Sequence, residues 1–271
     1  MSKINIVDFE RNLLTLFKNI KLNKVKNIFI TTNLNQIANL RIPKENKLKS
    51  IYKCLKKVLG PGHSIFVPTA TLNLCNNDIP FDLYKTKSDK MGPFSEYIRL
   101  NNSIRCIHPF WSISGIGKKA KILNSVSKHA FGYGSAWSKM LDNNFTQVNL
   151  GIHPSKAVTL VHHVETVIGV PYRYNKKFVK IVKIRNRSYQ DEFYQSVFFK
   201  NIDIKKKIAL NEHFFESINN KKKLNYSKSP DGLDAWSFKM EDFFATASEM
   251  FLKDIYTYLD FKPNLSKISD L

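Results

Sequence analysis

The first seventy residues alternate between segments typical of amphipathic helices and segments typical of buried strands. Residues 8–25 and 47–59 carry apolar side chains at helical spacing, and the second segment stops at Gly60. Residues 26–32 (KNIFITT) and 64–70 (SIFVPTA) are short and apolar. A helix–strand–helix–strand order is typical of parallel strands, because each helix carries the chain back to the edge where the next strand begins. We therefore predict an α/β fold built on a parallel sheet.

Beyond residue 70, the periodicity predicts further helices and strands around a long connection. Residues 71–117 are expected to be mostly loop, and 146–152 a third core strand. The other expected elements are helices over 118–128, 136–141, 159–168, 203–219 and 234–260, and strands over 178–185 and 195–199. We expect a single domain over 1–271, with a core over 1–175. The C-terminal part, 176–271, is expected either to complete the same fold or to form a small lobe.

The composition is strongly basic. Lysine and arginine total 43 and aspartate and glutamate 22, for a formal net charge of +21. Such a field favours anionic partners and repels polycations. A lysine-rich chain is also what an AT-rich genome would encode. Only 7 of the 43 basic residues are arginine, which is the residue that nucleic-acid-binding proteins favour for contacts with bases and phosphates. No nucleic-acid-binding motif is present. We therefore expect no nucleic-acid partner.

The apolar segments and the cysteines indicate in which cellular compartment the protein is expected. No apolar run approaches the ~18–20 residues that span a bilayer, and the N-terminal segment lacks the pattern of a signal peptide. The 3 cysteines are odd in number and widely spaced, which argues against a disulfide framework or a zinc knuckle. We expect a cytoplasmic protein without a membrane span.

The most informative segment is Thr159-x-x-His162-x-x-Glu165, on an expected helix. Residues three apart share a helix face, so the carboxylate of Glu165 can hold the imidazole of His162 in one tautomer and raise its basicity. The alternative interpretation is a capped amphipathic helix with a polar edge. A metal site that also used His163 is disfavoured, because adjacent residues point to different helix faces and no third ligand stands nearby.

A second group of residues is Arg105-x-x-His108-Pro109-x-x-Ser112, followed by Gly115-x-Gly117 and a lysine-rich segment. A glycine turn that opens a helix can bind phosphate through backbone N–H groups. This turn is too short for a P-loop and lacks the spacing of a dinucleotide loop, so by itself the segment favours an ordinary turn over a phosphate site. The chain has no G-x-S-x-G elbow and no H-E-x-x-H motif, which disfavours an α/β-hydrolase and a zinc protease.

Taken in order, these motifs resemble those of the aminoglycoside 3-N-acetyltransferase family of acyl-CoA-dependent N-acyltransferases. The matching segments, over roughly residues 58–175, are Val58-Leu59-Gly60-Pro61-Gly62, Val67-Pro68-Thr69, Pro80-Phe81-Asp82, Ser88-x-x-Met91-Gly92, Glu96-x-x-Arg99, Arg105-x-x-His108-Pro109-x-x-Ser112, Gly115, Phe131-Gly132-x-Gly134-Ser135, Leu150-Gly151, Thr159-x-x-His162-x-x-Glu165 and Val170-Pro171-Tyr172-Arg173. The resemblance implies a layered α/β/α fold with a largely parallel central sheet. One departure is Thr31-Thr32-Asn33-Leu34, where the family usually has His-Ser-Ser-Leu.

The resemblance also implies a mechanism and a site. His162 would be the general base, and Glu165 would orient it. The acceptor amine would attack the thioester of acetyl-CoA, or of another short acyl-CoA, directly and without a metal. The coenzyme-binding residues would be Thr31, Thr32, Thr69, Arg105, His108 and Ser112. The substrate-binding residues would be Asp82 and, close after the catalytic helix, Arg173, Lys176 and Lys177.

The net charge of the chain indicates which acceptor substrate to expect. A protein at +21 suits a polycationic aminoglycoside poorly, so we expect an anionic amino sugar, nucleotide-linked or in surface-polysaccharide biosynthesis. The stretch from Pro171 to Lys176 resembles family members found with that pathway. The alternatives are an aminoglycoside acetyltransferase that confers antibiotic resistance, and a non-catalytic protein that binds coenzyme A or nucleic acid. The sequence does not indicate an oligomeric state.

Overall fold

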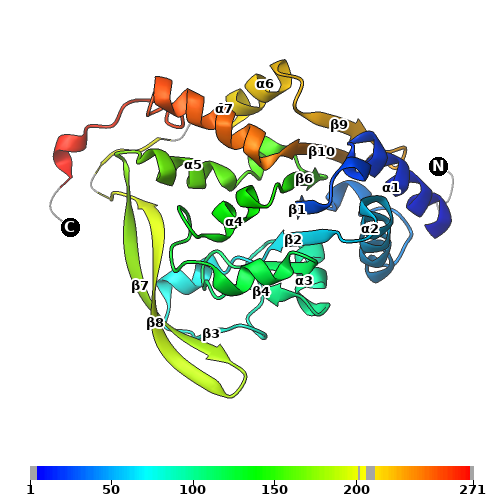
Figure 1. The fold of residues 1–271 in the computed structure, drawn as a ribbon, viewed down its shortest axis with the longest axis horizontal. Helices are drawn as coiled ribbons and strands as arrows, with labels where there is room; N and C mark the ends of the chain where they lie inside the picture. The colour runs from blue at the N-terminus through cyan, green and yellow to red at the C-terminus, as the bar shows by residue number, and fades with distance from the viewer. Residues whose placement is uncertain (1–4, 201, 206–210, 269–271) are drawn as a thin grey trace.

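A seven-stranded sheet forms the centre of the computed structural model, which describes residues 5–200, 202–205 and 211–268 (Figure 1). Its strand order is β4-β5-β2-β1-β6-β10-β9. The strands are β1 (Asn27–Thr32), β2 (Ser64–Pro68), β4 (Ile104–Arg105), β5 (Ile113–Gly117), β6 (Thr146–Leu150), β9 (Asn225–Lys228) and β10 (Asp234–Lys239). The central strands β2, β1 and β6 are parallel, and the flanking strands pair antiparallel. The predicted α/β fold class is confirmed, with the parallel pairing at the centre of the sheet.

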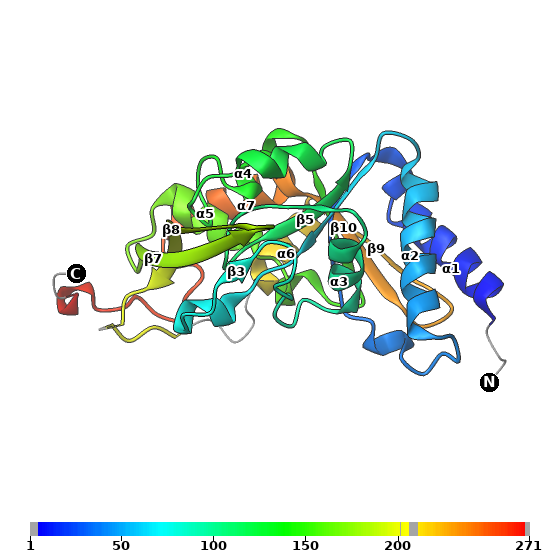
Figure 2. The ribbon, with the colours of Figure 1, turned by 90° about the horizontal axis from the view of Figure 1, so that it is seen from below.

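Helices cover both faces of this sheet, because successive side chains of a strand point to opposite faces. In β1, Ile28 and Ile30 join one core cluster and Phe29 joins the other. The first cluster includes residues of α1 (Ile6–Asn19), α2 (Lys44–Leu59) and α3 (Pro93–Leu100). The second includes residues of α4 (Ala136–Asp142), α5 (Leu160–Ile168), α6 (Glu212–Asn220) and α7 (Met240–Lys253). Figure 2 shows the two helix layers on opposite sides of the sheet.

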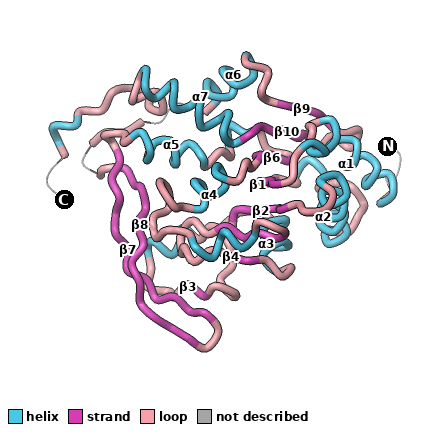
Figure 3. The backbone as a smooth tube through the Cα atoms, viewed as in Figure 1, coloured by secondary structure: helices cyan, strands magenta, loops and turns pink. Residues whose placement is uncertain are grey.

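A second sheet lies beside the first. It has the order β3-β7-β8, with β3 at Phe81–Asp82, β7 at Arg173–Ile184 and β8 at Arg187–Phe198. The strands β7 and β8 form a long hairpin that extends away from the helices (Figure 3). Its turn begins at Arg185, which has a positive φ of 54°, the backbone conformation that two-residue hairpin turns favour. Short 3₁₀ turns connect the other elements: Leu22–Lys24, Asn35–Ile37, Leu72–Asn76, Ala120–Ser125, Pro154–Lys156 and Leu265–Lys267.

Several sequence expectations differ from the structure. The helix expected over 234–260 is wrong in its first part, because Asp234–Lys239 is strand β10, paired with β6. The segment 71–117, expected to be mostly loop, contains α3 and β5. The helix expected over 118–128 is a 3₁₀ turn. The helix expected over 203–219 is present only from Glu212, where α6 begins. Residues 206–210 lie outside the described residues.

The C-terminal part both completes the first sheet, through β9 and β10, and builds the second sheet. That residues 1–271 form a single domain stays a prediction. No helix in the described part of the chain is long and apolar enough to span a membrane.

Candidate active site

Helix α5 carries the histidine and the glutamate that the sequence singled out. Its buried apolar residues, among them Val161 and Val164, pack in the core, and Gly169 ends the helix in the left-handed conformation at a φ of 78°. His162 and Glu165 lie one turn apart on the same face. The distance from His162 Nδ1 to Glu165 Oε2 is 2.6 Å. The helix therefore forms the His–carboxylate pair that the spacing predicted.

Glu165 is a buried carboxylate with three partners. Its side chain is 0 % exposed. The hydroxyl of Tyr172 donates to Oε1 at 3.0 Å, and Arg173 Nε lies 3.0 Å from Oε2. Burial by itself would raise the pKa of Glu165, but the hydrogen bond from His162 and the charge of Arg173 outweigh it and lower that pKa. Glu165 is therefore held as a carboxylate, which can only accept hydrogen bonds.

That carboxylate sets the tautomer of His162. Arg173 Nη2 also approaches His162 Nδ1, but at 3.4 Å, whereas Glu165 Oε2 lies 2.6 Å away. Since the carboxylate needs a donor and makes the shorter contact, the proton belongs on Nδ1. The lone pair of the neutral imidazole then lies on Nε2, which becomes the basic nitrogen.

Arg173 holds this carboxylate from the start of β7. Its side chain is 8 % exposed, its guanidinium lies 3.8 Å from the centre of the Phe198 ring, and it donates to the carbonyl of Ser196. We expected Arg173 to bind an anionic acceptor. The structure places it inside the protein as the ion-pair partner of Glu165, because the short connection after α5 turns β7 back against the helix. An acceptor-binding role for Arg173 stays a prediction.

Aromatic rings surround the imidazole of His162, which is 19 % exposed. The ring centres of Phe131, Tyr258 and Trp111 lie 5.7, 5.9 and 6.5 Å from that of His162. Such an apolar shell excludes water and strengthens the interaction of His162 with Glu165. Of these rings, Trp111 also lines a cavity.

This inner cavity of about 270 Å³ lies at the ends of β1 and β2, beside the start of α5. Its lining residues are Thr31, Thr32, Pro68, Ala70, Lys90, Met91, Trp111, Ser112, Ile113, Trp137, Ile152, Lys156, Ala157 and Thr159. Four buried polar atoms on this lining make no hydrogen bond within the described residues: the hydroxyls of Thr31 and Thr32 and the indole Nε1 atoms of Trp111 and Trp137. A ligand with carbonyl and amide groups would supply their partners. The inner cavity therefore suits a polar, extended molecule.

Three of the residues expected to bind coenzyme form a buried network. Arg105 Nη2 donates to the carbonyl of Thr69 at 2.7 Å, and its Nε donates to Ser112 Oγ at 3.0 Å. Ser112 Oγ in turn donates to the Thr69 carbonyl at 2.6 Å. Of these three residues, only Ser112 lines the inner cavity. The network fixes the loop that presents Trp111.

His108 supports the same loop. It is 3 % exposed, and its Nδ1 accepts from the backbone N–H of Trp111 at 3.1 Å. Burial lowers the pKa of His108 to about 4, so the ring is neutral near pH 7. The structure thus places His108 behind the cavity lining, whereas Thr31, Thr32 and Ser112 lie on it.

The other residues expected to bind the acceptor lie on the second sheet. Asp82 accepts from the backbone N–H groups of Tyr84 and Lys85, each at 2.9 Å, and so caps a turn. Lys176 lies over the ring of Phe178, and Lys177 pairs with Glu192 on the exposed side of the hairpin. Within the described residues, none of these contacts brings Asp82, Lys176 or Lys177 to His162 or to the inner cavity. An acceptor-binding role for them stays a prediction.

Several residues of the site were not assigned from sequence. Tyr172 stands in the Val170-Pro171-Tyr172-Arg173 segment and Trp111 in the segment that ends at Ser112, but neither spacing predicts a contact. Tyr258 reaches His162 from after α7, nearly a hundred residues away. Among residues 5–200, 202–205 and 211–268, no three His, Cys, Asp or Glu side chains lie together as a metal site would require.

Comparisons with known proteins find one family model and several similar structures. The model of the aminoglycoside 3-N-acetyltransferase family matches residues 32–251. A structure of AAC-IIIb with CoASH is 16% identical, covers 93% of this chain and 97% of its own, and has a TM-score of 0.75. The YokD protein from Bacillus subtilis is 14% identical, with 92% and 94% covered and a TM-score of 0.73. A variant of AAC(3)-IVa in complex with a gentamicin is 17% identical, with 92% and 90% covered and a TM-score of 0.69. Curated proteins gave no match.

Proposed function

Because this chain belongs to the aminoglycoside 3-N-acetyltransferase family and is therefore an N-acetyltransferase, we propose that it transfers an acetyl group from acetyl-CoA to an amine of an amino sugar. His162 is the general base of this proposal. The observation that carries this role is the fully buried Glu165, which lies 2.6 Å from Nδ1 of the imidazole. Trp111 lies beside the same imidazole and also lines the inner cavity.

The proposed chemistry begins with a proton transfer. An amino sugar is mostly an ammonium ion near neutral pH and is not nucleophilic until it loses a proton. With Nδ1–H donated to Glu165, Nε2 of His162 takes that proton, and the resulting imidazolium is stabilised by the buried carboxylate. The free amine then attacks the thioester carbonyl, so that a C–N bond forms and the C–S bond breaks. The imidazolium returns its proton to the departing thiolate, the acylated nitrogen loses its excess proton to solvent, and His162 ends the cycle neutral.

Acetyl-CoA supplies the activated acetyl group, and the inner cavity fits its thioester end. The hydroxyls of Thr31 and Thr32 and the indole N–H groups of Trp111 and Trp137 are donors for the carbonyl oxygens of the thioester and the pantetheine arm. In the comparisons, AAC-IIIb binds CoASH.

Direct transfer is favoured over a covalent acetyl-enzyme. Burial raises the pKa of each cysteine thiol, Cys54, Cys75 and Cys106, to about 11. Such thiols are almost entirely protonated near pH 7 and are poor nucleophiles. The hydroxyl of Ser112 is bonded to Arg105 and to the carbonyl of Thr69, with no base beside it among the described residues.

For the acceptor, an aminoglycoside is the class that the comparisons favour. A gentamicin is bound to the AAC(3)-IVa variant and sisomicin to AAC-VIa in similar structures. Acetylation replaces an ammonium by a neutral amide, and we infer that the cellular outcome is antibiotic resistance. The second candidate is an anionic amino sugar, nucleotide-linked or on a polysaccharide precursor, which the net charge of +21 favours.

Thiol release from acetyl-CoA tests both candidates. We would measure kcat/KM for gentamicin, sisomicin and a nucleotide-linked amino sugar, each at 20 mM and 300 mM salt. A higher kcat/KM for the aminoglycosides supports the first candidate, and a higher kcat/KM for the nucleotide sugar, falling with salt, supports the second. No thiol release with any amine would refute the proposed activity.

His162→Asn tests the general base. We expect kcat to fall by about 10²–10⁴, the usual contribution of general acid–base catalysis, with the Kd for CoA nearly unchanged. The matched control is His129→Asn, which alters a ring that stacks on Tyr194 on the hairpin. Near-wild-type turnover of His162→Asn would remove His162 from the mechanism.

A further inference from the structure

A small pocket of about 230 Å³ lies at the edge of the first sheet. Four segments meet there: the turn after β3, the last turn of α3, the edge strand β4 and the 3₁₀ turn Ala120–Ser125. We call it the edge pocket, and its lining residues are Leu83, Tyr84, Arg99, Ser103, Ile104, Arg105 and Asn124. None of these residues lines the inner cavity. Two arginines therefore border the edge pocket and, among the described residues, neither aspartate nor glutamate does.

Arg105 is a buried charge without an ion-pair partner in the described part of the chain. The residue is 6 % exposed, and Asp82 and Glu96 act on it only at longer range. Burial lowers the pKa of Arg105 to about 10, so the guanidinium stays charged near pH 7. Its Cζ lies 4.8 Å from the centre of the Phe81 ring, which covers one face. A buried charge is costly unless a counter-charge compensates it, and the protein itself places none beside Arg105.

The hydrogen bonds of Arg105 leave part of its guanidinium free. It donates through Nε to Ser112 Oγ, and through Nη1 and Nη2 to the carbonyls of Thr86 and Thr69. These bonds use three of the five N–H groups that an arginine carries. All three acceptors are uncharged. Arg105 therefore keeps donors for a charged acceptor in the edge pocket that it lines.

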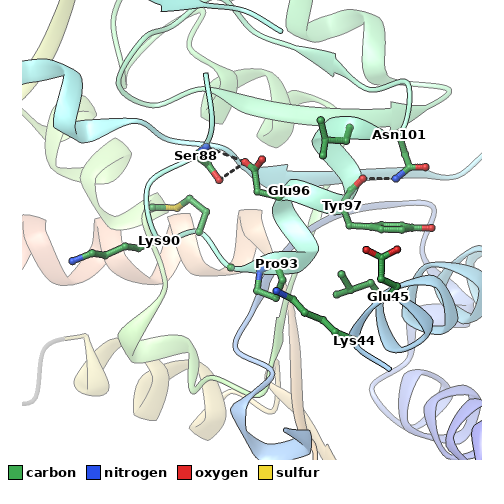
Figure 4. A pocket seen from close by; sticks show the side chains of 12 residues that line it. Lys44, Glu45, Ser88, Lys90, Pro93, Glu96, Tyr97 and Asn101 are labelled. Carbon is green, nitrogen blue, oxygen red and sulfur yellow. Dashed lines mark hydrogen bonds between the residues drawn. The ribbon is translucent and has the colours of Figure 1, made fainter. Parts of the chain in front are cut away.

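Arg99 brings a second guanidinium to the same pocket. Its side chain is 5 % exposed, and it donates to Glu96 and to the carbonyl of Tyr84. Figure 4 shows that Glu96 also accepts from Ser88, on the wall of a separate cavity of about 690 Å³ between α2 and α3. Glu96 lines that cavity and not the edge pocket. One carboxylate thus serves two guanidiniums, and the edge pocket keeps a net positive charge.

The size and the chemistry of the edge pocket indicate its ligand. Pockets for larger organic ligands usually measure about 300–1,000 Å³, so this one suits a small molecule or ion. Guanidinium groups match the oxygens of a phosphate through paired N–H donors. We propose that the edge pocket binds a small oxyanion of the phosphate class, which pairs with Arg105 and Arg99. The site is independent of the proposed acetyl transfer.

Thermal unfolding and titration calorimetry with inorganic phosphate test this site. Because Arg105 also holds the loop of Thr69 and Ser112, an oxyanion that pairs with it should stabilise the folded chain. At a phosphate concentration of about ten times the Kd, we expect Tm to rise by about 3–5 °C over chloride of the same ionic strength. The calorimetric titration should show binding to the unaltered chain under the same conditions.

Asn124→Asp is the variant that separates this pocket from other anion sites. Asn124 is exposed, and its side chain makes no hydrogen bond within the described residues, so the substitution should leave the fold intact. A carboxylate on the lining should repel the oxyanion, weaken phosphate binding at least tenfold and abolish the rise in Tm. A substitution of Arg105 itself is less informative, because it would also release Thr69 and Ser112.

Asn23→Asp is the matched control. It makes the same change in net charge at an exposed position that does not line the edge pocket, and it should respond to phosphate as the unaltered chain does. Glycerol 3-phosphate distinguishes the two sources of the oxyanion: tighter binding than phosphate indicates a phosphorylated metabolite, and weaker binding indicates the free ion. Absence of phosphate binding at 20 mM, or an equal response of both variants, would overturn the proposal.

Discussion

The substitution Glu165→Gln tests whether the buried carboxylate is needed for catalysis or only for the fold. Glutamine has nearly the same shape, and its amide oxygen can still accept from His162 Nδ1. What the substitution removes is the negative charge. Tyr172 then loses a carboxylate acceptor, and Arg173, which is 8 % exposed, loses its ion-pair partner. The variant therefore separates the charge of the pair from its shape.

Two effects follow, with different magnitudes. Removal of one partner of a buried ion pair costs about 3–5 kcal/mol, and the lower end applies here because Arg173 keeps its contacts with Ser196 and Phe198. For a chain of this size, about 3 kcal/mol lowers Tm by roughly 5–10 °C. Without the carboxylate, the imidazolium formed during the reaction is no longer stabilised, and we expect kcat to fall by about 10²–10³.

The assay combines urea unfolding, thiol release at saturating acetyl-CoA, and calorimetric binding of CoA. Glu192→Gln is the matched control, because Glu192 is exposed and pairs only weakly with Lys177 across the hairpin. We expect it to change neither stability nor kcat. If Glu165→Gln folds, binds CoA and turns over within twofold of the unaltered chain, the carboxylate is structural and the reasoning about the His162 tautomer is wrong.

Two further predictions concern stability. Burial lowers the pKa of His163 to about 4, so the folded state resists the proton that the unfolded chain takes up below about pH 6.5. The contribution of His163 to the free energy of unfolding is therefore fully present above that pH and should fall by about 1 kcal/mol on going from pH 7 to pH 5.5. His163→Asn keeps an acceptor for the N–H of Gly132. If the urea midpoint of this variant falls with decreasing pH as steeply as that of the unaltered chain, the assignment to His163 is wrong. A Cβ on Gly151, which has a φ of 71°, would lie 1.9 Å from the Asn33 carbonyl, so Gly151→Ala should lower Tm by more than about 10 °C or prevent folding. Gly62→Ala, at a φ of 75° with open space, should cost only about 1 kcal/mol, and equal effects of the two variants in thermal unfolding would refute the steric argument.

Local patterns in the sequence were sufficient for much of the fold. Residues 26–32 and 64–70 are short apolar segments that alternate with amphipathic helices, and this order is why an α/β fold could be predicted. The pairing of His162 with Glu165 was also accessible, because a three-residue spacing on a helix has only one geometry. Both features depend on residues close together in the chain.

Tertiary structure decided what depends on distant residues. Asp234–Lys239 was expected to be helical, but it pairs with β6, and a strand gains its stability from the neighbour across the sheet rather than from its own sequence. The position of Arg173 also depends on distant residues. The sequence shows only a basic residue after the helix, whereas the fold places its guanidinium between Glu165 and the Phe198 ring. A buried charge must find its counter-charge wherever the fold brings one, and the distance along the chain does not reveal where that is.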